Sequence, residues 1–245
     1  MQKTEKYSLV WFRNDLRIAD NAVLAKASKQ ADRVIGLYCF DPRHFEKNRF
    51  GFKKIEKYRT GFLIESVHNL RAQLDALNID LLVYHDLPEN VIPKICEANQ
   101  ITDIYLQKEW TQEEVDTENT VKAQTTDVNW HHIYNQFLYH PEDINFDVSK
   151  TPQVFTVFRK KLEKYIDIRE ESRITKQGQN NRIENNTSIP SLSDLGFADF
   201  KSHPNSAFPF KGGETEALKR LNNYLVETVF IKNTYGEGYS VLLND

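Results

Sequence analysis

The chain is poor in residues that build covalent or metal-bound frameworks. Its 245 residues include only two cysteines, Cys39 and Cys96, which lie far apart within apolar runs. They have no zinc or redox spacing, so both are predicted to be small buried hydrophobic residues. The adjacent His131 and His132 cannot chelate one ion together, because neighbouring strand residues point to opposite faces. The sequence therefore predicts no metal site.

Long apolar runs, surplus basic charge and glycine-rich phosphate loops are also missing. No stretch approaches the ~20 apolar residues of a membrane helix, and the opening residues do not resemble a signal peptide. We therefore expect no membrane association and a cytoplasmic location. The net charge of −3 argues against strong nonspecific nucleic-acid binding but leaves room for a local basic patch. No phosphate loop, Ser–His–Asp or Cys–His arrangement suggests a catalytic residue.

What the sequence does contain is a regular alternation of apolar runs and helical patterns. Short runs rich in β-favouring residues are predicted as strands over 7–12, 33–40, 80–84, 103–107 and 128–134. The helices predicted between them cover 21–30, 55–77, 89–98 and 111–125. Asp20 is expected to cap the first of these helices, and Thr111 with Glu114 the last. The predicted fold class is α/β, with a Rossmann-like five-stranded parallel sheet and helices on both faces.

The remainder of the chain follows a different pattern. Residues 178–209 are rich in Asn, Ser and Pro, which is typical of a long connector. A helix is predicted before it, over 153–165, and a terminal amphipathic helix after it, over 214–230. The predicted organisation is an α/β domain over 1–135, an extended connector with one helix over 136–212, and a third part over 213–245.

Polar clusters follow three of the predicted strands, at the sheet edge where ligands bind in parallel α/β folds. The first is Arg13-Asn14-Asp15, whose charges either bind an anion, pair with a neighbouring domain or form a solvated strand end.

The second and third clusters carry aromatic residues beside carboxylates. Phe40-Asp41-Pro42-Arg43 either clasps a flat heterocycle or simply ends its strand at Pro42. Glu109, followed by Trp110, either accepts paired N–H donors from a pterin-like ring or has a structural or solvated role. The residues alone thus predict a heterocycle site but no reaction.

Several longer stretches, in order, resemble the photolyase/cryptochrome family and its cryptochrome DASH branch. They are LVWFRNDLRIADNAVL, YCFDPRHF, the helix from Tyr58 to Arg71, LYHPEDINF, the stretch from Pro152 to Arg159, and SAFPFKGGETEALKRL. The resemblance covers about Tyr7 to Phe230, nearly the whole chain.

The resemblance implies an N-terminal antenna domain that binds a folate, 5,10-methenyltetrahydrofolate. Glu109 matches the carboxylate that holds the pterin, and Phe40, Asp41, Pro42 and Arg43 match the stretch lining the same pocket. Asn14 and Asp15 match the opening motif beside it. Such a domain passes blue or near-ultraviolet excitation to a helical domain that binds FAD and receives pyrimidine dimers in DNA.

The part over 213–245 matches only the start of that FAD domain, so FAD, DNA contact and the carbon–carbon lyase reaction are expected to need a separate flavin domain. No catalytic residue is expected here, and the chain alone is expected to be inactive. The alternative is a non-catalytic interaction module or a degenerate remnant, with the terminal helix forming a homodimer or docking a partner.

Overall fold

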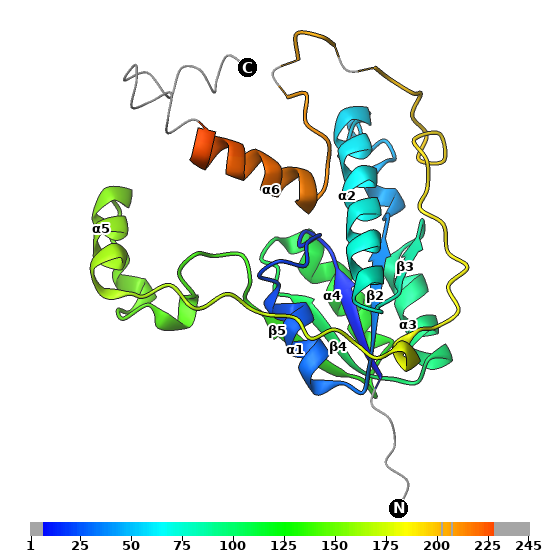
Figure 1. The fold of residues 1–245 in the computed structure, drawn as a ribbon, viewed down its shortest axis with the longest axis horizontal. Coiled ribbons are helices and arrows are strands. Elements are labelled where there is room, and N and C mark those ends of the chain that lie inside the picture. The colour runs from blue at the N-terminus through cyan, green and yellow to red at the C-terminus, as the bar shows by residue number, and fades with distance from the viewer. Residues whose placement is uncertain (1–6, 202, 207, 228–245) are drawn as a thin grey trace, which may run out of the picture.

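A five-stranded parallel sheet forms the centre of the computed structural model, which describes residues 7–201, 203–206 and 208–227 (Figure 1). The strands are β1 (Tyr7–Phe12), β2 (Arg33–Cys39), β3 (Leu81–Tyr84), β4 (Ile101–Gln107) and β5 (Asn129–Ile133). Their order across the sheet is β3-β2-β1-β4-β5, and every adjacent pair is parallel. The predicted α/β, Rossmann-like fold class is confirmed.

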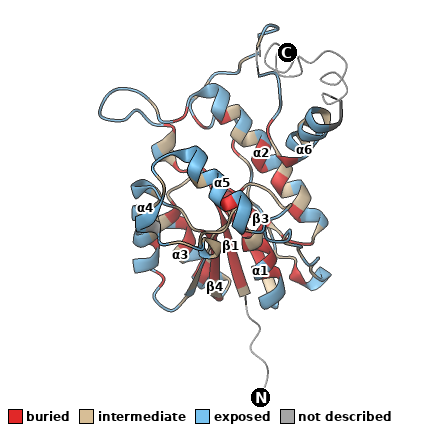
Figure 2. Cartoon of the chain, turned by 90° about the vertical axis from the view of Figure 1, so that its left-hand side faces the viewer, coloured by how far each residue is buried: buried red, intermediate tan, exposed pale blue. Residues whose placement is uncertain are grey.

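Helices cover both faces of this sheet because successive strand residues point to opposite sides. Val10 and Phe12 join one core cluster with residues of α1 (Ala22–Gln30) and α2 (Lys57–Ala76). Leu9 of β1 joins the other, with residues of α3 (Pro88–Ala98) and α4 (Gln112–Ala123). The central strands β1 and β2 are therefore buried on both faces, as Figure 2 shows for β1, which explains why they are almost continuously apolar. The edge strand β5 is only partly buried.

One predicted helix cap is wrong, and the other has the predicted residue without the capping hydrogen bond. The N-cap of α1 is Asn21, whose Oδ1 accepts a hydrogen bond from the backbone N–H of Leu24 at 3.0 Å. Asp20 instead takes a positive φ of 44° in the turn before it. Thr111 does precede α4, but its side chain makes no capping hydrogen bond. Local sequence offered two Asx residues at the first site, and only the turn geometry selects between them.

The stretch predicted as a long connector follows α5 (Phe155–Tyr165) and is attached to the α/β unit at several points. Its most buried polar residue is Asn181, which is 2% exposed. The Asn181 amide accepts from the Val34 N–H at 2.7 Å and donates to the Val34 carbonyl at 3.0 Å. It also donates to the Asn78 carbonyl at 2.7 Å. Because β3 begins opposite Gly36, Asn181 takes the place of a missing strand residue beside Val34.

The helix predicted over 214–230 is observed as α6 (Glu214–Asn222), followed by a π-helical turn, Asn223–Glu227. Residues 228–230 of the prediction lie outside the described residues. Just before α6 begins, the backbone at Gly212 passes very close to α2. A Cβ atom on Gly212 would lie 2.1 Å from the Phe62 carbonyl oxygen. The Glu214 carboxylate then accepts the backbone N–H groups of Ile18 and Ala19, at 2.9 and 2.8 Å. These contacts join α6 to the loop that follows β1.

We expect Asn181→Ala to lower the free energy of unfolding by roughly 2–4 kcal/mol, because it leaves three buried backbone groups without a partner. Urea denaturation followed by circular dichroism measures this loss. The exposed Asn186, which bonds only locally to Glu184, provides a control: Asn186→Ala should change stability by less than about 0.5 kcal/mol. Equal midpoints for the two variants would refute the strand-like role of Asn181.

Candidate functional site

The strand order creates a switch point between β1 and β4. From β1 the chain proceeds to β2 and β3 on one side, and then returns to β4 and β5 on the other. Connections that leave neighbouring strands in opposite directions open a crevice beyond the strand ends, where α/β proteins bind ligands. Asn14 follows β1 and Glu109 follows β4, so two of the predicted clusters meet at this crevice.

Glu109 is the half-buried carboxylate at this switch point. Its Oε1 accepts from the Asn14 amide at 3.3 Å and from the Gln107 amide at 3.1 Å. Its Oε2 accepts from the Gln136 amide at 2.8 Å. All three donors are neutral, so none of them neutralises the carboxylate charge. Gln136 lies in the connector and carries no motif, so sequence reasoning missed it.

Aromatic rings stand beside Glu109. Trp110 is 52% exposed and stacks on Tyr134, with ring centroids 5.4 Å apart and an interplanar angle of 29°. Phe137 packs against Trp110 at 6.2 Å. The Lys108 ammonium donates to the Tyr134 hydroxyl at 3.1 Å and lies about 5 Å from both stacked rings. The crevice therefore combines an uncompensated carboxylate with exposed aromatic surface.

Asp15, the other opening-motif residue, is buried, unlike the exposed Asn14. Its Oδ1 accepts the Arg13 backbone N–H at 3.0 Å. Burial raises the pKa of the Asp15 carboxyl, against the lowering effects of that backbone N–H and of the Arg13 and Arg17 charges. In this conformation Asp15 shapes the turn after β1, and Asn14 is the residue of the pair that reaches Glu109.

The second predicted cluster is arranged differently. Phe40 is fully buried and packs against Tyr38 and Phe45, so its ring faces the core. Pro42 opens a short 3₁₀ turn, Pro42–His44, which Asp41 caps by accepting the Arg43 N–H at 2.9 Å.

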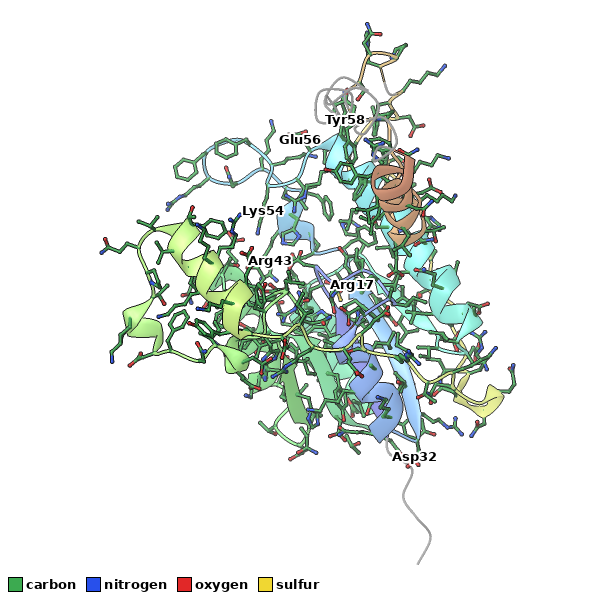
Figure 3. All side chains as sticks on the ribbon, turned by 60° about the vertical axis from the view of Figure 1, so that its left-hand side comes forward. Arg17, Asp32, Arg43, Lys54, Glu56 and Tyr58 are labelled. Atoms are coloured by element: carbon green, nitrogen blue, oxygen red, sulfur yellow. The ribbon has the colours of Figure 1, made fainter. Side chains whose placement is uncertain are left out.

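Arg43 is already held by two carboxylates. Its guanidinium contacts Asp41 at 2.5 Å and Glu89 at 3.0 Å. The hydrogen bond to Asp41, helped by the charges of both acids, raises the Arg43 pKa. Arg43 and Lys54 lie at the same end of the sheet as Arg17, whereas Asp32 lies at the opposite end (Figure 3). The Phe40–Arg43 cluster thus lies at the same sheet edge as Asn14 and Glu109. Of these residues, Asn14 and Glu109 are the pair from different clusters that contact each other directly.

An ion-pair network not anticipated from the sequence lies next to the crevice. The Arg13 guanidinium contacts the Glu118 carboxylate at 3.4 Å, donates to the Gln107 carbonyl and stands 5.0 Å from the Trp11 ring. Glu118 also contacts His132, while His131 pairs with Asp103 at 2.7 Å. The two histidines therefore have different partners. Within the described ranges, no group of three or more His, Cys, Asp or Glu side chains could hold a metal ion.

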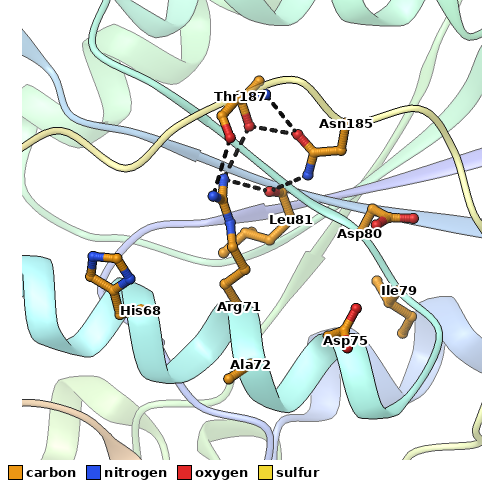
Figure 4. A pocket seen from close by; sticks show the side chains of 9 residues that line it. All are labelled: His68, Arg71, Ala72, Asp75, Ile79, Asp80, Leu81, Asn185 and Thr187. Carbon is orange, nitrogen blue, oxygen red and sulfur yellow. Dashed lines mark hydrogen bonds between the residues drawn. The ribbon is translucent and has the colours of Figure 1, made fainter.

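A separate cavity of about 510 Å³ lies between α2, the start of β3 and the connector (Figure 4). Arg71 donates there to the carbonyl and hydroxyl of Thr187 and to the Leu81 carbonyl. Asn185 donates to the same Leu81 carbonyl at 2.9 Å. These contacts fasten the connector to the sheet.

A family model for DNA photolyase matches residues 8–176, more than half of the chain. The chain therefore belongs to the DNA photolyase family.

In the part of the chain that the structure describes, no helix is long and apolar enough to cross a membrane.

Within that family, the chain is similar to the N-terminal region of cryptochrome DASH proteins. It is 36% identical to that of Gloeobacter violaceus over 230 residues, covering 93% of this chain and 46% of the relative. It is 37% identical to that of Xenopus laevis, covering 88% and 42%. The Synechocystis cryptochrome structure superposes with a TM-score of 0.79 at 36% identity, covering 93% and 47%. The chain thus spans about half the length of these relatives.

We expect Glu118→Gln to destabilise the protein in a pH-dependent manner. Burial alone would raise the Glu118 pKa, but His132 and then Arg13 outweigh it and hold this pKa below its usual value. Because the Glu118 pKa is lower in the folded state, the ionised carboxylate stabilises the fold at pH values above its ordinary pKa. This stabilisation is lost as the pH falls through the folded-state pKa. The variant should cost roughly 1–2 kcal/mol near neutral pH and almost nothing in strong acid.

Urea titrations at several pH values measure this difference. Glu97→Gln, at an exposed position near the end of α3, is the matched control and should leave the curves unchanged. A Glu118→Gln deficit that stays constant from neutral pH into strong acid would exclude a charge-based role.

Proposed function

We propose that this chain is a light-harvesting antenna domain that binds 5,10-methenyltetrahydrofolate at the crevice between β1 and β4. The observation that carries the proposal is the position of Glu109 at the switch point, where its hydrogen bonds with the described residues come from three neutral amides. A pterin ring offers adjacent N–H donors, and a carboxylate with two acceptor oxygens is suited to receive them. The half-exposed Trp110 beside it offers a flat apolar surface for the ring.

Neighbouring residues would assist in different ways. Asn14 lies within hydrogen-bonding distance of Glu109 and would orient its carboxylate toward the ring. Arg43 would bind the acidic tail of the folate by giving up one of its two ion pairs. Of the two partners, Glu89 lies farther from Arg43 along the chain than Asp41 does. Phe40, Asp41 and Pro42 would support the backbone that carries Arg43, because Phe40 itself is buried in the core. Asp15 would fix the turn that presents Asn14.

The bound folate would absorb near-ultraviolet or blue light, and the excitation would then pass from this domain to a flavin. We propose that FAD, DNA contact and dimer cleavage belong to a separate helical flavin domain rather than to residues described here. The archaeal photolyase from Sulfolobus tokodaii, whose structure contains two FAD molecules, shares the fold with a TM-score of 0.67 at 22% identity. Under this proposal the chain itself contributes binding and orientation, with no catalytic residue.

Glu109→Gln is expected to weaken folate binding by about tenfold or more, because the amide keeps the shape but loses the charge and one acceptor. Absorbance titration of the purified protein with methenyl-folate measures the change, and a parallel titration with FAD tests the flavin. Glu97→Gln serves as a control, since Glu97 is exposed near the end of α3. Equal folate affinity for Glu109→Gln and the unaltered chain would remove Glu109 from this role.

A second candidate function rests on an apolar groove between α2 and α6. The groove has a volume of about 430 Å³, and its lining includes Phe62, Phe208, Phe210, Leu221 and Tyr224. Leu218 and Leu225 of the same region are also exposed. Solvent-exposed apolar clusters of this kind mark interaction surfaces. We therefore propose that this face packs against a partner, either a flavin domain or a second copy of the chain.

The homodimer form of this proposal predicts a concentration-dependent sedimentation coefficient. Leu221→Glu should abolish that dependence by placing a charge in the apolar groove, whereas Val157→Glu on the exposed face of α5 should not. A monomer that persists at high concentration would contradict the homodimer and leave the flavin domain as the proposed occupant.

A further inference from the structure

The first residue of α6, Glu214, carries a buried carboxylate that lies outside the proposed folate site. The residue is 8% exposed, and its two oxygens accept the backbone N–H groups of Ile18 and Ala19 at 2.9 and 2.8 Å. A buried carboxylate is costly unless it is hydrogen-bonded, and backbone N–H groups bond strongly to a charged acceptor. Glu214 and the loop after β1 therefore hold each other in one arrangement.

The start of α6 is itself fastened to α2, beside which it lies in Figures 1 and 2. The Glu65 carboxylate accepts the Gly212 N–H at 2.6 Å. Asn69 exchanges two hydrogen bonds with Thr215, at 2.8 and 3.2 Å. Because α6 is held at these points, Glu214 ties the loop after β1 to the position of α6 on α2.

The loop held by Glu214 carries one of the hydrogen-bond donors of Glu109. Within this loop the Arg17 N–H donates to the Asp15 carbonyl at 2.7 Å, which closes a tight turn. Asn14 directly precedes the turn, and its amide donates to Oε1 of Glu109 at 3.3 Å. The direction in which Asn14 points therefore depends on the conformation of this loop.

The same loop also reaches the donor on the other oxygen of Glu109. The Arg17 guanidinium donates to the Asn135 carbonyl at 3.1 Å. The next residue along the chain is Gln136, whose amide donates to Oε2 of Glu109 at 2.8 Å. Each oxygen of the Glu109 carboxylate thus has a donor whose backbone belongs to this loop or lies next to a residue that the loop contacts.

We propose that Glu214 is a positioning residue for the crevice, which couples the position of α6 to the orientation of the Glu109 carboxylate. The proposal deepens the folate-binding function and rests on it for the identity of the ligand. With Glu214 in place, Asn14 and Gln136 hold both carboxylate oxygens before the ligand arrives, so less freedom is lost on binding. A partner that displaces α6 would change the affinity for the ligand, and the ligand would change the affinity for that partner by the same factor.

A nitrogen–proton NMR spectrum of the isotope-labelled full chain tests the positioning role without any ligand. The side-chain amide signals of Asn14 and Gln136, assigned by their loss in Asn14→Ala and Gln136→Ala, report the hydrogen bonds to Glu109. Glu214→Gln keeps the size of the side chain but replaces one acceptor oxygen by a donor group, so both signals should shift. Signals that keep their positions in Glu214→Gln would overturn the proposal.

Two controls separate positioning from general destabilisation. Asn181→Ala should lower stability but leave both amide signals in place, because Asn181 bonds to Val34 near the start of β2, away from the crevice at the strand ends. Glu216→Gln removes the same charge from the same turn of α6, where Glu216 pairs with Lys219 instead, and should also leave them in place. Equal shifts in Asn181→Ala and Glu214→Gln would reduce Glu214 to a structural role and contradict the proposal.

Absorbance titration with methenyl-folate then measures the coupling to the ligand. Glu214→Gln should weaken binding by about threefold to tenfold, the loss expected for one hydrogen bond, while both controls should bind like the unaltered chain. Shifted amide signals with unchanged folate affinity would overturn the coupling. If the unaltered chain takes up no folate, the folate-binding function fails, and the amide signals still decide whether Glu214 positions the donors of Glu109.

Discussion

The position of β1 at the centre of the sheet is the constraint on which the rest of the structure depends. β1 pairs with β2 on one side and β4 on the other, so the chain must leave in one direction and return in the opposite one. That reversal opens the crevice at the strand ends and brings Asn14 to Glu109, 95 positions along the chain. The candidate site is thus a product of topology before any individual side chain is considered.

Electrostatics then distinguish among the charged groups at this edge. Arg43 has Asp41 and Glu89 as partners, and Arg13 has Glu118. Among the residues that the structure describes, Glu109 has amides alone as hydrogen-bond partners. Charges that are already paired gain little from a ligand, because each new contact replaces an existing one. A carboxylate among neutral donors can still accept a positively polarised partner, which is why the proposed folate site is centred on Glu109.

The sequence was sufficient for the sheet and for part of the site, for physical reasons that individual residues show. Strands such as 7–12 were predictable because burial on both faces requires continuous apolar residues. Glu109 was predictable as a strand-end residue. Phe40 was predicted as a ligand contact from its motif, but it shares one face of the sheet with Tyr38, two residues earlier, and both rings belong to the core cluster that includes α2. The roles of Asn181 and Gln136 depend on contacts with distant backbone or side-chain groups, which no local pattern encodes.

The Glu214 carboxylate connects two ends of the described chain, because it bonds to the backbone of Ile18, 196 positions earlier. During synthesis on the ribosome, the loop after β1 emerges 196 residues before Glu214, so this contact forms only after the elements between them have been made. Even β1 gains its neighbour β4 only after about ninety further residues have been made. The nascent chain therefore passes through a long period in which its central strand is incompletely covered.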